Sequence, residues 1–161
     1  MADIPGEAIG RGAIAPLAPP PRDTARAMSQ ENVEVVKVAY EAFARGGLDR
    51  YMEHFTDDVV YRAVEGAPDD SGLIQGTDAV RAWLQDWIDT FDEFWFEPVE
   101  LIDAGEDTVV AIERFGGRAK LSGVETAQTE AVVYSIRGGK LARCREYATR
   151  AEALEAVGLR E

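Results

Sequence analysis

The spacing of apolar side chains predicts three helices in the first 91 residues. Ser29 can cap the first, whose apolar stripe runs to the Gly46-Gly47 pair, and a short second helix follows over residues 48–55. Thr77 can cap the third, whose apolar stripe is the most regular. That stripe consists of Val80, Trp83, Leu84, Trp87, Ile88 and Phe91. We expect it to cover a sheet.

Alternation of apolar and polar residues with period two predicts strands in most of the remaining chain. The expected strands are residues 59–64, 94–101, 108–115, 124–136 and 141–148. Glycine pairs predict a bend at Gly116-Gly117 and a tight turn over residues 137–139, and a short helix is expected over residues 150–157. Helices followed by hairpin-connected strands predict an α+β domain, with the helices on one face of an antiparallel sheet.

Residues 1–27 differ in composition from the rest of the chain. They hold five of the seven prolines, three glycines and no aromatic residue, so they can contribute little to a packed core. We expect a disordered leader there, with Met28 as a candidate start codon, and a single domain over residues 28–161. Three arginines and three acidic residues cancel within the leader, so the formal charge of -13 belongs to the domain.

Charge and the scarcity of soft ligands exclude several classes of function. Seventeen basic against thirty acidic side chains disfavour binding to nucleic acid and to anionic membranes. Cys144 has no second cysteine to pair with, and His54 is the single histidine, so no transition-metal cluster is indicated. No apolar run is long enough to span a membrane, and no glycine-rich motif indicates a cofactor. We therefore expect a cytoplasmic protein that uses no cofactor.

Three segments resemble a known family. They are residues 28–63 (MSQENVEVVKVAYEAFARGGLDRYMEHFTDDVVYRA), 74–87 (IQGTDAVRAWLQDW) and 137–159 (RGGKLARCREYATRAEALEAVGL). Their elements follow each other as in SnoaL-like members of the nuclear transport factor two-like superfamily, and the resemblance covers residues 28–161. It implies a cone-shaped α+β barrel, in which a curved antiparallel sheet wraps around the helices and forms a pocket. Enzymes and non-catalytic binding subunits share this fold, so the resemblance implies no single reaction.

Ketosteroid isomerases and polyketide cyclases are relatives within this superfamily. The positions that match the tyrosine donor, the basic aspartate and the protonated aspartate of the isomerases hold Ala39, Ala63 and Val132 in this sequence. Alanine and valine neither accept nor donate the protons that this reaction moves. Ketosteroid isomerase activity is therefore excluded unless other groups replace the missing ones.

Arg114 and Glu146 are the expected catalytic residues. On the strand over residues 108–115 either the even or the odd residues face the helices, and the family resemblance selects the even set, with Arg114 inward. On the last strand it turns Glu146 inward. We expect the two to form a buried ion pair, because an unpaired charge would be costly there. The pair is either structural, or Glu146 is a general acid or base assisted by Arg114, an arrangement that resembles limonene epoxide hydrolases and SnoaL-type cyclases. Gly116 replaces the second carboxylate of the epoxide hydrolases, so their complete relay is absent.

Several other residues are expected to line the pocket. Glu130 shares the parity of Tyr134 on its strand and is the candidate for a second carboxylate. The aromatic wall for a flat apolar ligand would consist of Tyr40, Tyr61, Trp83, Trp87 and Tyr134. The alternative is that these rings only fill the core. The Asp57-Asp58 and Asp69-Asp70 doublets lack the spacing of a calcium loop and are expected in solvated turns.

Two classes of function remain open at this stage. The first is an enzyme that catalyses cyclisation, isomerisation, dehydration or hydrolysis of a small apolar, polyketide-like or terpenoid-like molecule with an oxygen function. The second is a non-catalytic module that binds a ligand or a partner. The family resemblance also implies a homodimer formed through the outer face of the sheet, where the last strand carries Leu141, Arg143, Arg145 and Tyr147.

Overall fold

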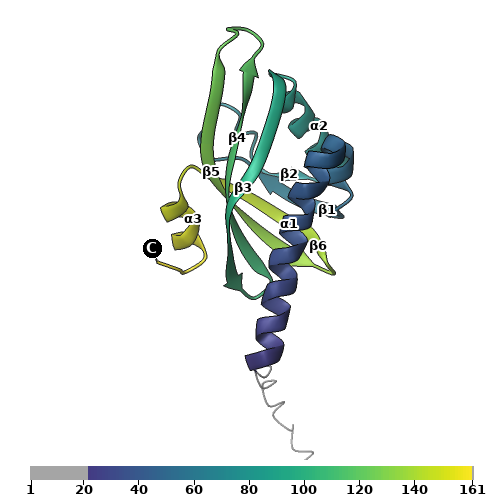
Figure 1. Ribbon diagram of the computed structural model, residues 1–161, viewed down its shortest axis with the longest axis vertical. Helices are drawn as coiled ribbons and strands as arrows, with labels where there is room; N and C mark the ends of the chain where they lie inside the picture. Colours follow the sequence, from purple (N-terminus) through teal and green to yellow (C-terminus); the bar gives the residue numbers. More distant parts are fainter. Residues whose placement is uncertain (1–21, 161) are drawn as a thin grey trace, which may run out of the picture.

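The structure is a computed structural model that describes residues 22–160. Its elements are α1 (Arg22–Met52), β1 (Phe55–Arg62), β2 (Ile74–Gln75), α2 (Thr77–Ile88), β3 (Phe91–Gly105), β4 (Thr108–Ala119), β5 (Glu125–Arg137), β6 (Lys140–Tyr147) and α3 (Arg150–Ala156) (Figure 1). This is the α+β order that the sequence predicts. Most of the expected leader, residues 1–21, lies outside the described residues, and residues 22–27 belong to the first turns of α1.

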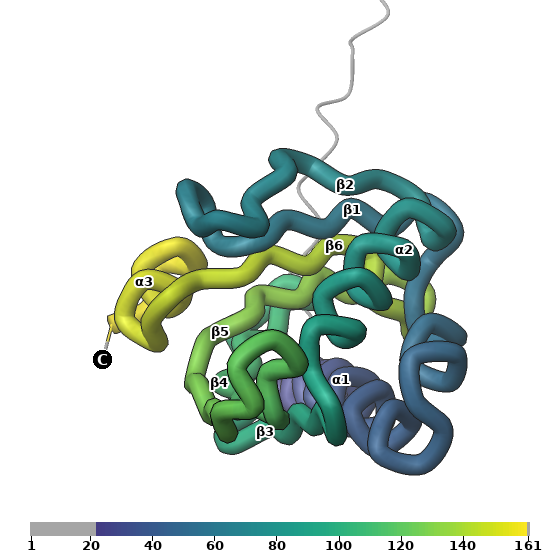
Figure 2. Tube along the Cα trace, turned by 90° about the horizontal axis from the view of Figure 1, so that it is seen from above, coloured from purple at the N-terminus to yellow at the C-terminus, as the bar shows by residue number. Residues whose placement is uncertain are grey.

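The strands form one six-stranded sheet in the order β2-β1-β6-β5-β4-β3. Neighbouring strands are antiparallel except β1 and β6, which pair in parallel. A series of consecutive hairpins does not predict this parallel pair. The sheet curves around α1 and α2, whereas α3 lies outside the arc (Figure 2). Because β2 and β3 remain edge strands, the sheet does not close into a complete barrel.

The helical part of the chain before β1 consists of two segments that meet at Gly47. This residue has φ 70° and ψ -159°, a conformation that is open to glycine and strained for other residues. The glycine pair thus ends the first segment as the sequence predicts, and a short second segment follows. The helix starts earlier than the expected Ser29 cap, at Arg22, and Phe55 already belongs to β1.

The expected bend at Gly116-Gly117 is wrong. Both glycines lie inside β4 and pair with residues of β5. A Cβ atom at Gly116 would lie 2.2 Å from the carbonyl oxygen of Thr126 and 2.9 Å from the Trp95 ring. Glycine is required there because the neighbouring backbone passes too close for a side chain, not because the chain turns.

Both faces of β4 are covered by helices. On the concave face Val109 and Ala111 belong to the main core, which α1 and α2 complete. On the convex face Val110 and Ile112 pack with Ala153 of α3. A strand that is buried on both sides is apolar at odd and at even positions, so its sequence pattern cannot show which set faces the pocket.

Candidate functional site

Arg114 lies on the convex face of the sheet, outside the pocket. Its side chain is 49% exposed, with Nη1 4.0 Å from Oε1 of Glu97, and its guanidinium lies over the ring of Trp95. The expected buried pair of Arg114 and Glu146 is therefore wrong. The odd residues of β4 face α1 instead, and this parity brings Glu113 into the pocket.

Three glutamates from neighbouring strands converge on the concave face. Glu113 of β4 lies directly opposite Glu130 of β5 in the ladder, and Glu146 of β6 lies opposite Val132 of β5. Glu113 and Glu146 are 7% and 9% exposed, and Glu130 is partly buried. The parity expected for Glu130 and for Glu146 is thus the one observed. Leu141 departs from its expected outward position, because an irregularity in the β5–β6 ladder turns it into the core.

Tyrosine hydroxyl groups donate hydrogen bonds to two of the glutamates. The hydroxyl of Tyr61 donates to Oε1 of Glu146 over 2.5 Å. The hydroxyl of Tyr40 donates to Oε2 of Glu113 and lies 3.1 Å from the Tyr134 hydroxyl, which in turn lies 3.1 Å from the Tyr51 hydroxyl. These contacts fix the carboxyl groups in position and satisfy the buried phenols.

Burial raises the pKa of all three carboxyl groups, but different neighbours make the three pKa values differ. Burial, followed by the charges of Glu146 and Glu113, raises the pKa of Glu130 to about 11. Burial also raises the pKa of Glu113, against the hydrogen bonds from Glu130 and Tyr40, which lower it. Glu113 is thus the acceptor in this pair, and Glu130 carries the proton. Burial raises the pKa of Glu146 to about 8, although the hydrogen bond from Tyr61 lowers it.

The carboxyl groups line two adjoining cavities. The inner cavity has a volume of about 40 Å³, and its walls include Tyr51, Leu84 and Phe96. The outer cavity has a volume of about 440 Å³ and lies between α2 and the loop that follows β1. Glu130, Glu146, Trp87 and Phe115 line both. The inner cavity has room for one polar group of a ligand, and the outer cavity has room for the rest of a small molecule.

Most of the predicted pocket residues lie at this site. Glu130, Glu146, Tyr61 and Trp87 line the inner cavity, and Trp83 lines the outer one. Tyr40 and Tyr134 are buried and line neither cavity. Tyr40 donates to Glu113 directly, and Tyr134 is linked to Glu113 through the Tyr40 hydroxyl. That any of these residues binds a substrate stays a prediction.

Glu113 is a site residue that the sequence did not predict. It is the acidic residue in an otherwise apolar stretch of β4, next to the arginine that the family resemblance turned inward. With the odd residues of this strand facing the helices, Glu113 lies opposite Glu130 and the two form a pair of carboxyl groups. Because both faces of this strand are buried, the apolar pattern gave no reason to prefer that set.

The structure also bears on metals and membranes. Within residues 22–160, no three His, Cys, Asp or Glu side chains are arranged to hold a metal ion. In the same part of the chain, no helix has the length and apolar character needed to cross a membrane.

A curved six-stranded sheet with helices on its concave side defines a protein with the nuclear transport factor two-like fold. Residues 36–144 match the SnoaL-like domain, and the chain belongs to this family. It is 30% identical over 117 residues to the uncharacterized protein Rv0034 of Mycobacterium tuberculosis, a match that covers 72% of this chain and 87% of Rv0034.

Solved structures show the same fold. A nuclear transport factor two-like protein of unknown function from Burkholderia pseudomallei has a TM-score of 0.64 and 22% identity, over 79% of this chain and 97% of that one. A proposed polyketide cyclase from Xanthomonas campestris has a TM-score of 0.62 and 20% identity, over 80% and 98%. Rv0760c of Mycobacterium tuberculosis, crystallised with estradiol-17β-hemisuccinate, has a TM-score of 0.63 and 15% identity, over 74% and 95%.

Proposed function

We propose that this protein is an acid–base enzyme that works without a cofactor on a small, largely apolar ketone. The observation that carries the proposal is that Glu130 and Glu146, two largely buried carboxyl groups with different pKa values, line the same cavity. Glu146, with a pKa of about 8, is available as a base near neutral pH, and Glu130, with a pKa of about 11, is available as an acid. Neighbouring acids with separated pKa values are typical of acid–base catalysis.

In the proposed reaction, the ionised form of Glu146 removes a proton from a carbon next to the carbonyl group. The electrons of the broken C–H bond form the double bond of an enolate, and Glu130 turns its single O–H from Glu113 to the enolate oxygen and donates a hydrogen bond there. In a β,γ-unsaturated ketone the enolate is conjugated with the second double bond, and return of the proton from Glu146 to the γ-carbon completes an isomerisation. Alternatively, the enolate carbon attacks a second carbonyl group of the same molecule, and the proton passes to the new alkoxide, which completes a cyclisation.

This proposal replaces the missing isomerase residues by groups from other positions. Ala39, Ala63 and Val132 are buried and carry no proton donor or acceptor in their side chains. Glu146 supplies a base from β6, and Glu130 supplies a donor from β5, because burial and the charges of Glu146 and Glu113 keep its proton in place. The likeness to a proposed polyketide cyclase and to a protein crystallised with estradiol-17β-hemisuccinate supports a ligand with fused or flat rings.

Deuterium exchange tests the proposal even when the product is unknown. A panel of aromatic and cyclic ketones is incubated in D₂O with the full chain, and incorporation of deuterium next to the carbonyl is followed by mass spectrometry. We expect Glu146→Gln to lower the exchange rate of an active ketone by about 100-fold or more, the usual contribution of a general base. Glu34→Gln is the matched control, because Glu34 is exposed on α1, outside the residues that line the cavities.

A non-catalytic binding role is the second candidate, and the small inner cavity favours it. About 40 Å³ leaves little space for a reacting carbon beside Glu146 unless side chains move. Quenching of tryptophan fluorescence reports binding, since Trp83 and Trp87 line the outer cavity. Ketones that quench the fluorescence but exchange no deuterium, or that exchange equally fast with Glu146→Gln, would refute the enzymatic proposal and leave the binding role.

A further inference from the structure

The loop between β1 and β2 contributes one acid to the outer cavity. Asp69 lines this cavity together with Val64, Ala67 and Pro68 of the same loop. The Asp69 carboxylate has no hydrogen bond and no ion pair with any residue of the described range 22–160, and only its backbone carbonyl accepts a bond, from Ser71. The side chain is half-buried. A carboxylate held at a cavity without a partner is available to a ligand.

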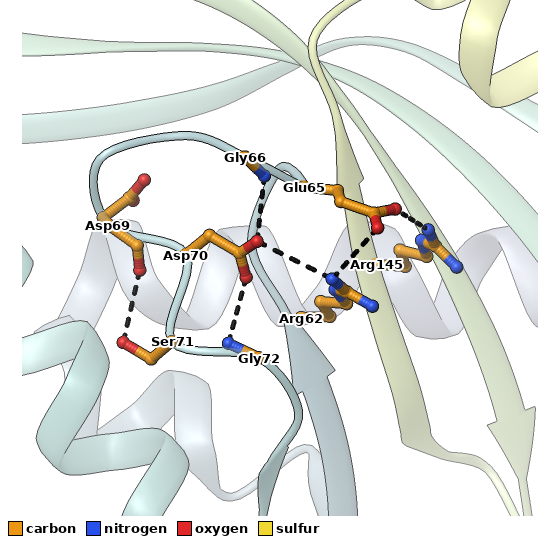
Figure 3. A network of polar contacts seen from close by, with 8 residues as sticks. All are labelled: Arg62, Glu65, Gly66, Asp69, Asp70, Ser71, Gly72 and Arg145. Carbon is orange, nitrogen blue, oxygen red and sulfur yellow. Dashed lines mark hydrogen bonds and ion pairs between the residues drawn. The ribbon is translucent and has the colours of Figure 1, made fainter.

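The adjacent Asp70 fixes the loop. Its two carboxylate oxygens accept hydrogen bonds from the backbone N–H groups of Gly66, over 2.9 Å, and Gly72, over 3.0 Å. Nη2 of Arg62 lies 3.6 Å from Oδ2 of Asp70 and 3.5 Å from Oε1 of Glu65. Figure 3 shows that the Asp69 side chain points away from this network. The network thus holds Asp69 in place without neutralising it.

Aromatic side chains also line the outer cavity. They are Trp83 and Trp87 of α2, Phe91 and Phe115. No lysine, arginine or histidine lines either the outer or the inner cavity, within the described residues 22–160. Indole rings beside a carboxylate attract organic cations, whereas the formal charge of -13 and the acids of the cavity repel anions.

We infer that the outer cavity binds the ammonium group of a small organic cation, held between the carboxylate of Asp69 and the indole rings of Trp83 and Trp87. The inference rests on the proposed function for the other end of the molecule, where a carbonyl group reaches Glu130 and Glu146. The substrate class is then an amine whose apolar body joins the cationic end to the reacting ketone. Asp69 is a specificity determinant and takes no part in the proton transfer.

A pair of probes of equal shape tests the ammonium site. Benzyltrimethylammonium is a permanent cation, and neopentylbenzene is its neutral counterpart, so the two probes share a shape and differ in charge and in hydration. Titration of the full chain, followed by tryptophan fluorescence, should show that the cation binds about tenfold more tightly, as a contact to a carboxylate and two indoles predicts. Asp69→Asn should remove most of this preference and leave the affinity for neopentylbenzene unchanged.

The control separates the site from the general charge of the protein. Glu34→Gln removes the same charge from the exposed face of α1 and should leave both affinities unchanged. Equal affinities of the two probes for the wild type, or an equal loss in Asp69→Asn and Glu34→Gln, would overturn the inference. Circular dichroism checks that Asp69→Asn is folded, which we expect because its carboxylate makes no bond within the loop.

The binding test does not depend on turnover, so the two proposals can fail separately. Selective binding of the cation through Asp69, without deuterium exchange in any ketone, would support the ammonium site and refute the enzyme. The opposite result has two parts: ketones without an amine exchange deuterium in a reaction that requires Glu146, and Asp69→Asn leaves the KM of amine-bearing ketones unchanged. This result would support the enzyme and refute the ammonium site.

Discussion

At the scale of single residues, Glu146 shows how this fold tolerates a buried acid without a basic partner. The side chain is 9% exposed, and the hydroxyl that donates to it belongs to Tyr61, which is itself buried and neutral. Without a cation nearby, the protein lowers the cost of burial by keeping the proton on the carboxyl group. A group that is neutral at rest and titrates near physiological pH can exchange a proton with a substrate in either direction.

This protonation makes the stability of the protein depend on pH. Folded Glu146 keeps its proton up to a pKa of about 8, whereas a glutamate in the unfolded chain releases it near a pKa of about 4.3. The stabilisation is fully present below the unfolded value and is lost as the pH rises through 8. We therefore expect the free energy of unfolding to fall from about pH 5 to about pH 8, by about 1.4 kcal/mol per pH unit for each retained proton.

Urea unfolding at a series of pH values measures this dependence. Glu146→Gln has no proton to lose, so its slope should be flatter than that of the wild type by up to about 1.4 kcal/mol per pH unit. The exposed Glu34→Gln should keep the wild-type slope. Identical slopes in wild type and Glu146→Gln would show that Glu146 is already ionised in the folded protein at pH 5.

At the scale of elements, the sequence predicted the helices and hairpins well, because each has a covered face and an exposed face. The stripe of α2 and the turn before β6 are examples. The sequence could not show the parity of β4, because α3 covers the convex face and makes Val110 and Ile112 as apolar as the residues opposite them. The candidate site inherited that error: Glu146 and Glu130 were predicted, and Glu113 was replaced by Arg114.

Neighbouring substitutions on β4 test which of its faces lines the pocket. Glu113→Ala leaves the Tyr40 hydroxyl and the Glu130 carboxyl without their buried acceptor, so we expect it to cost about 1–3 kcal/mol. Arg114→Ala removes an exposed side chain whose carboxylate contact is 4.0 Å long and should change the free energy of unfolding by no more than about 0.5 kcal/mol. Chemical denaturation at pH 7 measures both. The opposite order of costs would restore the inward position of Arg114.

At the scale of the whole molecule, the charges are distributed unevenly. The chain carries a formal charge of -13, yet the convex side of the sheet near β6 presents the exposed side chains of Arg143 and Arg145. Together with Leu73 and Val133 they line a cavity of about 370 Å³ on that face. Arg145 lies 3.2 Å from Glu65, so this face carries both signs of charge, and in a two-fold interface the arginines of each copy can meet a carboxylate of the other. This face is thus the surface through which we propose that the protein forms a homodimer.

Leu73 is the residue through which to test the homodimer. Its side chain is 66% exposed beside the two arginines, so an aspartate there should leave the fold intact and prevent an apolar contact between copies. Light scattering after size exclusion should give the mass of a dimer for the wild type and of a monomer for Leu73→Asp, with similar melting temperatures. Val99→Asp is the matched control, because Val99 is 58% exposed on β3, away from this face, and should remain dimeric. A wild type that is still monomeric at about 100 μM would exclude a dimer with a micromolar Kd. A dimeric Leu73→Asp would show that the interface lies elsewhere.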